Sequence, residues 1–493
     1  MAPIAQWIEH LASDQGVRGS SPFRCVLLFL WLLKRGKMLD LKIAKMQRGL
    51  FLFLLFLFPL DASRCKLHFF KLFFHPSDLV ILVIFSLFFF RKKKEWASSL
   101  WQGPSKWLFL FFIMGAVSLC FSQFPISSEH KSRLLVFFTK ALLFSSAIFL
   151  MKEGGERFFI RCLYVIGAFA LIEACFALFC YYTQSFCDMR HFRLIPLSQM
   201  INPCSVSLPH GFRWIGDRLF GVERIPEAIL RAYGTCNHPN ILGGYLVFTL
   251  SVSHFIFFHA KKNWIRRGVG CSIFLQILAL STTFSRAALF SYLGATVLFF
   301  LLFYFLKKEA FFMHRKTSAL LVGLVGFSLL TSFLFFHEQF FHRGGVLQYN
   351  ELSRSSDQMR WAAQDRAILL IKEHPFFGVG LENFQKRAAF SGAEKGPMLH
   401  NCYLLIAVEM GLIALFLFLV FLCSLFYVPK QLSLHALLFF STLVGLLMIG
   451  FVDFYPLFLQ GGMVPFFIVC SLFYSSRLCF LRELRKEAVL LRT

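Results

Sequence analysis

The chain has 493 residues, of which 57% are hydrophobic, only 16% are charged and 68 are phenylalanine. This composition excludes a soluble globular domain and indicates an integral membrane protein. The formal net charge of +25 would suggest nucleic-acid binding in a soluble chain. Here, however, Lys and Arg fall in short loops between apolar runs, as the positive-inside rule predicts. The 14 cysteines show no C-x-x-C pair or metal-ligand spacing, so most are expected to be small core residues.

The first two dozen residues are polar and differ from the rest of the chain. They resemble the peptide obtained when a bacterial transfer-RNA gene is translated as if it were coding. We therefore interpret residues 1–45 as a doubtful N-terminal extension, with Met38 or Met46 as the natural start. The alternative is a disordered tail or a poor signal sequence. A cleavable signal peptide is not expected, because the basic residues 35–37 follow the apolar run 26–33 instead of preceding it.

Twelve apolar segments follow, and each is predicted to form a helix. Lipid offers the backbone no hydrogen-bond partner, so only helices and closed barrels span a bilayer. The expected fold is therefore all-α, a polytopic membrane protein with about twelve transmembrane helices. The segments are residues 48–60, 77–90, 107–124, 134–151, 158–182, 239–258, 270–283, 287–306, 317–336, 401–427, 434–452 and 456–475.

The short loops between these segments are basic, and in a twelve-helix count they all fall on one side. That side is assigned to the cytoplasm. Two long loops, residues 183–238 and 337–400, fall together on the opposite side, so charge and loop length give the same orientation. We expect residues 46–182 to form the first five helices. Residues 183–475 form the rest of one membrane domain with both long loops, and residues 476–493 form a basic cytoplasmic tail. Cys187 and Cys204 share the first long loop, where a disulfide is possible.

Both long loops carry more arginine than this charge bias predicts. An arginine near the membrane core costs about 2.5–3.5 kcal/mol on insertion scales, so one at a helix mouth usually has a role. Arginine is favoured over lysine where a phosphate is held by two parallel hydrogen bonds. We select Arg231 and Arg286 because each lies at a helix mouth, and we interpret Arg190, Arg193 and Arg343 as solvated charges. The other loop arginines are Arg213, Arg218, Arg224, Arg354, Arg360, Arg366 and Arg387.

Arg231 opens the sequence RAYGTCNHPNILGG, which marks a helix start. Asn237 is the predicted N-cap, and Pro239 suits the first helical turn. Gly243 and Gly244 permit close helix approach inside the membrane. Arg231 is thus expected just outside a helix N-terminus, which itself favours anions.

The second long loop is predicted to contain a helix over residues 358–372. Ser355 and Gln358 form a capping box, and His374-Pro375 ends the helix. Its apolar side is expected to carry Trp361, Ala362, Ile368 and Leu369. The following FFGVGLENF is a tight turn, and its G-V-G is only a weak indication of nucleotide binding because no strand precedes it. We interpret the helix as a lid lying on the membrane surface.

His400 and Asn401 stand where the tenth apolar segment begins. An imidazole at a membrane boundary, at the end of a long loop, is suited to proton transfer. The plainer alternative is that His400 and Asn401 cap the helix and contact lipid headgroups. Arg286 lies in the tight turn FSRAA on the same side. Arg231, Arg286 and His400 are therefore expected to meet in one cavity at the outer leaflet.

Four motifs, in this order, resemble the O-antigen ligase and polymerase family of bacterial polytopic membrane proteins. They are RAYGTCNHPN (231–240), TTFSRAALF (282–290), HPFFGVGLENF (374–384) and HNCYLLIAVEMGLIAL (400–415). Asp453 and the QGG at 460–462 also resemble the last loop and helix of that family. The similarity covers residues 231–470, and the N-terminal helices match only in number and hydrophobicity.

The resemblance implies a glycosyltransferase of the bacterial inner membrane. It would take a glycan from undecaprenyl diphosphate on the periplasmic face and join it to an acceptor hydroxyl, such as one on lipid A-core. Arg231 and Arg286 would bind the leaving diphosphate, and His400 would orient or deprotonate the acceptor. Asn240, Arg360 and Asn401 are the expected substrate-binding residues. No metal or nucleotide cofactor is implied, and the partners are the lipid-linked glycan, the acceptor and membrane lipid, without nucleic acid.

These motifs do not separate a ligase from a polymerase or from an enzyme that glycosylates protein Ser or Thr. A transporter or flippase is a further alternative. It would place interrupted helices and buried charges at mid-membrane, whereas the polar groups here cluster at one face, so we rank it lower. We interpret Glu382, Asp365 and Glu409 as structural, through helix capping or, for Glu409, a buried hydrogen bond.

Overall fold

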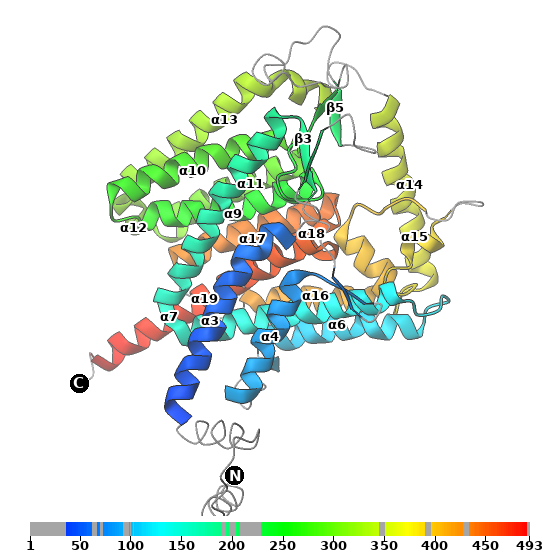
Figure 1. Cartoon of the computed structure of the whole chain (residues 1–493), viewed down its shortest axis with the longest axis horizontal. Coiled ribbons are helices and arrows are strands. Elements are labelled where there is room, and N and C mark those ends of the chain that lie inside the picture. The colour runs from blue at the N-terminus through cyan, green and yellow to red at the C-terminus, as the bar shows by residue number, and fades with distance from the viewer. Residues whose placement is uncertain are drawn as a thin grey trace, which may run out of the picture. The chain divides into compact units, whose positions relative to one another are not determined.

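The computed structural model describes residues 36–61, 67–69, 72–91, 98, 100–101, 103–188, 193–196, 204–207, 228–344, 351–389, 396–426 and 433–490 (Figure 1). The chain forms two units, Met1–Gly49 and Leu50–Thr493. Met38 and Met46 lie in the first helix described, and residues 1–35, most of the predicted extension, lie outside the described residues.

The described residues are mainly helical. The helices are α3 (Gly36–Asp61), α4 (Pro76–Arg91), α6 (Pro104–Cys120), α7 (Ser128–Tyr182), α9 (Pro239–His259), α10 (Asn263–Thr282), α11 (Arg286–Leu306), α12 (Lys308–Met313), α13 (Arg315–Gly344), α14 (Glu351–Glu373), α15 (Phe384–Arg387), α16 (Cys402–Phe426), α17 (Leu434–Val452), α18 (Tyr455–Phe458) and α19 (Gln460–Leu490). Three antiparallel pairs of short strands are β1 (Leu67–Phe69) with β2 (Leu72–Phe74), β3 (Ser185–Asp188) with β4 (Arg193–Pro196), and β5 (Ser205–Ser207) with β6 (Ala228–Leu230).

Each of the twelve predicted apolar segments overlaps a helix, so the all-α membrane fold is confirmed. Within the described residues, six helices are long and apolar enough to cross a membrane, namely α7, α9, α11, α13, α16 and α17. The basic stretch 152–157, predicted as a loop, is helical except at Gly155, where φ of 64° kinks α7 between two predicted segments. The total of twelve crossings stays a prediction.

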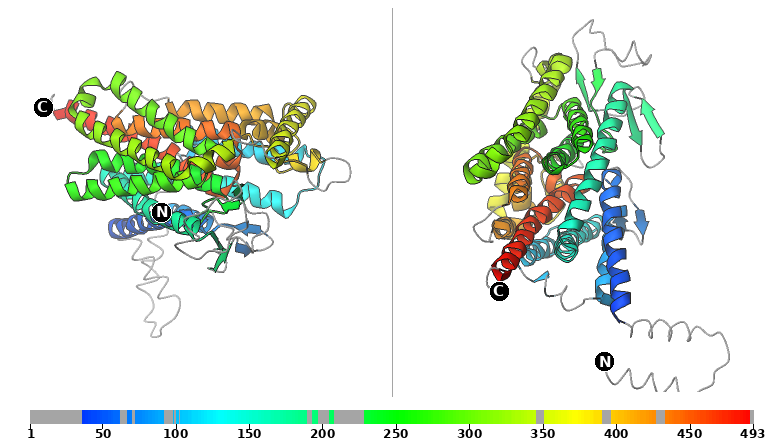
Figure 2. Two further views of the ribbon diagram at one scale, coloured as in Figure 1. Left: turned by 90° about the horizontal axis from the view of Figure 1, so that it is seen from above. Right: turned by 90° about the vertical axis from the view of Figure 1, so that its left-hand side faces the viewer.

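Helix α9 is surrounded by other helices. Its side chains are buried along nearly its whole length, and it packs against α7, α10, α11, α17 and α19 (Figure 2). The predicted close approach at its glycines is confirmed. A Cβ at Gly243 would lie 2.8 Å from the Cβ of Ala288, and one at Gly244 would lie 2.4 Å from the Tyr455 hydroxyl.

The N-cap of α9 is His238, not the predicted Asn237. The His238 side chain accepts a hydrogen bond from the Asn240 backbone N–H at 3.1 Å. Pro239 occupies the first turn as expected. The cap is therefore an imidazole nitrogen one residue later than predicted, and Asn237 lines a cavity instead.

Helix α16 is broken at Gly411, where φ is 87°. The preceding loop fills the break, because Val379 N–H donates to Val408 O at 2.8 Å and Gly380 N–H donates to Glu409 O at 3.0 Å. A Cβ at Gly411 would lie 1.9 Å from the carbonyl oxygen of Phe376, so only glycine fits there. The predicted glycine turn, residues 376–384, therefore holds the second long loop against α16, and we call it the clamp loop.

The same loop is also tied to the connection between α6 and α7. Asn383 is buried, and its Nδ2 donates to Ser122 Oγ at 2.8 Å. Its Oδ1 lies 3.1 Å from His130 Nε2, while His130 Nδ1 accepts from Ser127 N–H at 2.9 Å. Since Nδ1 accepts, Nε2 carries the proton and donates to Asn383. The loop is thus held on two sides.

Helix α14 is the helix predicted in the second long loop, and it ends before His374 as expected. Two details were wrong. The helix begins at Glu351, so Ser355 lies inside it and is not its N-cap. Among its described side chains, Ala363, Ala367 and Leu370 are buried, and the helix packs against α16. The predicted apolar side, which includes Trp361 and Leu369, is exposed instead.

Candidate functional site

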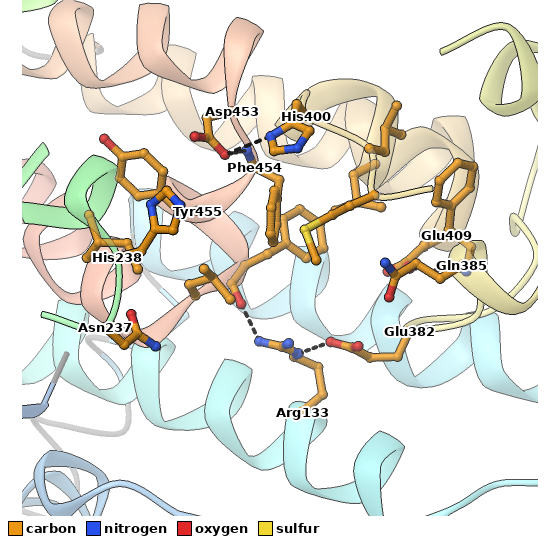
Figure 3. Close-up of a pocket in the computed structure, with 17 residues that line it drawn as sticks. Arg133, Asn237, His238, Glu382, Gln385, His400, Glu409, Asp453, Phe454 and Tyr455 are labelled. Carbon is orange, nitrogen blue, oxygen red and sulfur yellow. Dashed lines mark hydrogen bonds and ion pairs between the residues drawn. The ribbon is translucent and has the colours of Figure 1, made fainter. Parts of the chain in front are cut away.

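A cavity of about 350 Å³ lies where the first residues of α7, α9 and α16 meet the residues that follow α17 (Figure 3). Its polar lining comes from these helix ends and from the clamp loop before α15. The polar residues are Arg133, Asn237, His238, Glu382, Gln385, His400, Glu409, Asp453 and Tyr455. Phenylalanine, leucine, isoleucine and methionine side chains line the remainder, so the polar groups converge in apolar surroundings.

His400 and Asp453 lie next to each other at one end of this cavity (Figure 3). His400 Nδ1 lies 3.4 Å from Asp453 Oδ1, which is ion-pair distance but long for a hydrogen bond. The His400 side chain is 25% exposed and that of Asp453 is 8% exposed. The imidazole is therefore accessible to a ligand, and the carboxylate behind it is shielded.

Asp453 holds its charge despite being buried. Burial by itself raises the pKa of Asp453. The interactions with His400 and Asn240 together lower it by more than burial raises it, so the pKa lies below its usual value. Asn240 Nδ2 donates to Asp453 Oδ2 at 2.8 Å, and Phe454 N–H donates to Oδ1 at 2.8 Å. At neutral pH this residue is consequently a carboxylate.

Arg231 is buried behind this pair and does not line the cavity. Its Nη2 donates to Asn240 Oδ1 at 2.7 Å, and its Nε donates to the Thr283 carbonyl at 2.6 Å. The two ends of the Asn240 amide are thus both used. Arg231, Asn240, Asp453 and His400 form one continuous polar chain from the TTFSR turn to the cavity.

Arg286 is the first residue of α11 and is exposed. Ser285 caps that helix by accepting from Ala288 N–H at 3.5 Å. The backbone carbonyl of Thr283, three residues before Arg286, accepts the hydrogen bond from Arg231 Nε. The three predicted segments do come together, but of the three predicted catalytic side chains only His400 lines the cavity.

The predicted substrate-binding residues have different positions. Asn240 lies in the polar chain and not on the cavity wall. Asn401 caps α16, since its Oδ1 accepts from Tyr403 N–H at 2.9 Å and Leu404 N–H at 3.0 Å. Arg360 is half-buried on α14 and does not line the cavity. The loop residues Arg190, Arg213, Arg218 and Arg224 lie outside the described residues, as do the side chains of Arg193, Arg343 and Arg354.

Sequence reasoning missed Arg133. It lies near the start of α7, where its Nε donates to Glu382 Oε1 and its Nη1 donates to the Phe458 carbonyl. Glu409 is buried nearby and accepts from Phe384 N–H at 3.3 Å. The signal was present, because Arg133 falls between the predicted segments 107–124 and 134–151, on the side where the positive-inside bias disfavours arginine.

His238 also contacts a thiol. Cys204 Sγ lies 3.4 Å from His238 Nε2. Burial raises the pKa of Cys204, but the hydrogen bond and charge of His238 outweigh it and lower the pKa to about 7. Cys187 and Cys204 are both free thiols, so the disulfide considered for this loop does not form.

One protein-family model matches part of the chain. The model of the O-antigen ligase family matches residues 271–419, from α10 into α16, which includes Arg286, Arg360 and His400. No curated protein matches the chain. Within the part of the chain that the structure describes, no group of three or more His, Cys, Asp and Glu side chains has the arrangement of a metal site. Residues 271–419 thus resemble the O-antigen ligase family, and this match together with the multi-pass helical fold supports an assignment to the O-antigen ligase and polymerase family.

Proposed function

We propose that the protein transfers a glycan from undecaprenyl diphosphate to a hydroxyl of lipid A-core, on the periplasmic face of the bacterial inner membrane and without a metal ion. The observation that carries the proposal is the His400–Asp453 pair in a cavity at the helix ends, with His400 inside the segment that the family model matches. If the chain crosses the membrane twelve times as predicted, with both long loops in the periplasm, this cavity lies on the side where the lipid-linked glycan is used.

In this reaction the acceptor hydroxyl loses its proton to His400. Nδ1 of His400 faces Asp453, which leaves Nε2 for the acceptor. The carboxylate holds the ring and stabilises the imidazolium that forms, as in other His–Asp pairs. The acceptor oxygen then bonds to the anomeric carbon, and the bond from that carbon to the diphosphate oxygen breaks. Undecaprenyl diphosphate leaves with the electron pair.

The leaving diphosphate needs a cation, and Arg286 is suited to that role. Its side chain is exposed, and among the described residues no hydrogen bond or ion pair holds it. Two unit charges 4 Å apart attract by about 4 kcal/mol at an effective dielectric near 20. A two-pronged arginine–phosphate contact at a helix N-terminus therefore supplies a large part of the stabilisation otherwise provided by a divalent ion.

Arg231 acts differently in this proposal from the role implied by family resemblance. Its guanidinium is already bound to Thr283 O and Asn240 Oδ1. It is therefore a positioning residue that holds Asn240, and through it Asp453, in place. Its loss would change the rate of transfer more than the affinity for donor.

The proposal is tested in the source bacterium by deleting the gene and restoring it as wild type, His400→Ala or His337→Ala. His337 is an exposed histidine of α13 outside the cavity. Surface glycan is separated on a gel, and lipid-linked glycan is extracted in parallel. We expect wild type and His337→Ala to restore O-chains on lipid A, while His400→Ala leaves long chains on the carrier. Full restoration by folded His400→Ala protein would refute the mechanism.

The alternative functions on this scaffold give other results in the same experiment. A polymerase deletion leaves a single repeat attached to lipid A with no ladder above it. If the protein glycosylates other proteins, its deletion leaves both glycan pools unchanged, and glycan is lost from glycoproteins. If it is a transporter or flippase, its deletion leaves the lipid-linked glycan on the cytoplasmic side.

A further inference from the structure

The cavity has a second polar end whose residues the proposed reaction does not use (Figure 3). It consists of Arg133, Glu382, Gln385 and Glu409. We propose that this end binds a pyranose ring of the acceptor glycan through its hydroxyl groups and so presents the acceptor to His400. This inference rests on the proposed function and adds to it a binding subsite for the acceptor sugar.

The charges at this end favour a neutral ligand over a diphosphate. Arg133 is already paired with Glu382, and Glu409 adds a second carboxyl group from α16. A diphosphate here would compete with the Glu382 carboxylate for Arg133 and be repelled by that carboxylate. A sugar hydroxyl both donates and accepts, so neighbouring hydroxyls can donate to Glu382 and accept from Arg133 without any change in net charge.

Both partners of the ion pair remain within reach of a ligand. The Arg133 side chain is 21% exposed and that of Glu382 is 33% exposed. The cavity volume of about 350 Å³ is at the lower end of the range for small-molecule sites. Phe384, Phe454 and Phe458 also line it, which gives the apolar face of a sugar ring surfaces to pack against.

The backbone at Glu382 supports a role for its carboxylate. Its φ is 63°, in the left-handed region that side chains other than Gly, Asn and Asp rarely adopt. Glycine would hold this turn without strain. Strain of this kind is characteristic of binding and catalytic positions, where the side chain is needed at that place.

The turn is also rigid. Asn383, the next residue, is held by Ser122 and His130, and Leu381 N–H donates to Ser118 Oγ at 3.2 Å. On the other side the loop is clamped to α16 at Val408 and Glu409. The Glu382 carboxylate and Arg133 are thus held at fixed positions, as specific recognition of a sugar requires.

The first test measures sugar binding without any transfer reaction. Protein in lipid nanodiscs is titrated with two deacylated probes, the lipid A-core oligosaccharide and the O-antigen repeat unit, and binding is followed by saturation-transfer NMR. We expect one probe to bind wild type and His337→Ala with affinities within about twofold. Glu382→Gln should weaken binding about tenfold or more, the usual effect of losing a charged hydrogen bond. Glu373→Gln, the same change at an exposed site on α14, should have no effect.

Glu382→Gly separates loss of the carboxylate from damage to the turn. It removes the side chain but suits the positive φ, so it should bind as weakly as Glu382→Gln while melting at or above the wild-type temperature. In a reconstituted transfer assay, both variants should raise KM for the acceptor and leave KM for the lipid-linked donor unchanged.

The outcomes separate this inference from the proposed function. Unchanged probe binding in folded Glu382→Gln, failure of both probes to bind wild type, or a rise in donor KM alone would overturn the subsite. If wild type transfers no glycan yet binds a probe in a Glu382-dependent way, the proposed function fails and the sugar site stands. Binding of the core oligosaccharide indicates a ligase, and binding of the repeat unit indicates a polymerase.

Discussion

Replacing Asn240 with alanine tests the polar chain that leads from Arg231 to His400. The change removes the bond from Asn240 Nδ2 to Asp453 at 2.8 Å and the bond from Arg231 to Asn240 Oδ1 at 2.7 Å. A hydrogen bond to a charged group contributes about 1.5–3 kcal/mol. If Asp453 must be held to stabilise the imidazolium, this loss lowers kcat about ten- to hundredfold. Because Asn240 does not line the cavity, KM for donor and acceptor should change little.

The same variant should alter the pH dependence of transfer. Asn240 is one of the groups that keep the pKa of Asp453 below its usual value, so its removal raises that pKa. A carboxylate with a lowered pKa in the folded protein contributes stability above its unfolded pKa and loses it as the pH falls through the folded value. Because the proposed reaction needs Asp453 as a carboxylate, the acid limb of the activity profile should move to higher pH in Asn240→Ala. The variant should also lose stability at a higher pH than wild type as the pH falls.

Initial rates of glycan transfer in proteoliposomes, measured across the acid range, check both results. Thermal unfolding of each variant is recorded in parallel, so that loss of folded protein is separated from loss of kcat. Asn401→Ala is a useful comparison, since it removes a helix cap beside His400 and does not touch Asp453. A wild-type kcat in Asn240→Ala would refute the polar chain, as would a loss that only follows the folded fraction.

Three further results are expected. Gly411→Ala should prevent stable folding, measured by thermal unfolding, because its Cβ would lie 1.9 Å from Phe376 O and the native φ is 87°; a normal melting curve would contradict this. Lys140→Met should destabilise by about 3–5 kcal/mol, because it leaves Asp78 buried without the cation 2.5 Å away; the double variant that also carries Asp78→Leu should recover most of it. Maleimide labelling of Cys204 should be half-maximal near pH 7, and at higher pH in His238→Ala.

Much of the helical framework follows from composition and periodicity alone. Lipid forces apolar runs into helices, and the predicted segment 434–452 coincides with α17. Pro239, Gly243 and Gly244 were interpreted correctly because a proline at a helix start and glycines at a crossing act through local geometry. The face of α14 was not, since its sequence carries two apolar stripes and only packing on α16 selects the buried one.

The site was predictable only in part. His400 stood out because it begins an apolar helix after a long loop. Its partner, Asp453, is held by a hydrogen bond from Asn240, which lies 213 positions away in the sequence. No local sequence pattern encodes such a pairing. The same holds for Arg133 and Glu382, which are 249 positions apart. Arg231 was selected for its position at a helix mouth, but which groups its guanidinium binds depends on the fold of the TTFSR turn.

In the proposed reaction His400 accepts the proton of the acceptor hydroxyl as the glycan leaves its lipid diphosphate. The most direct measurement is the initial rate of transfer by purified protein in proteoliposomes with lipid-linked glycan, lipid A-core and EDTA. Wild type and His337→Ala should transfer glycan at the same rate, and His400→Ala should retain less than about one hundredth of it. Equal rates for folded His400→Ala and wild type would contradict the account.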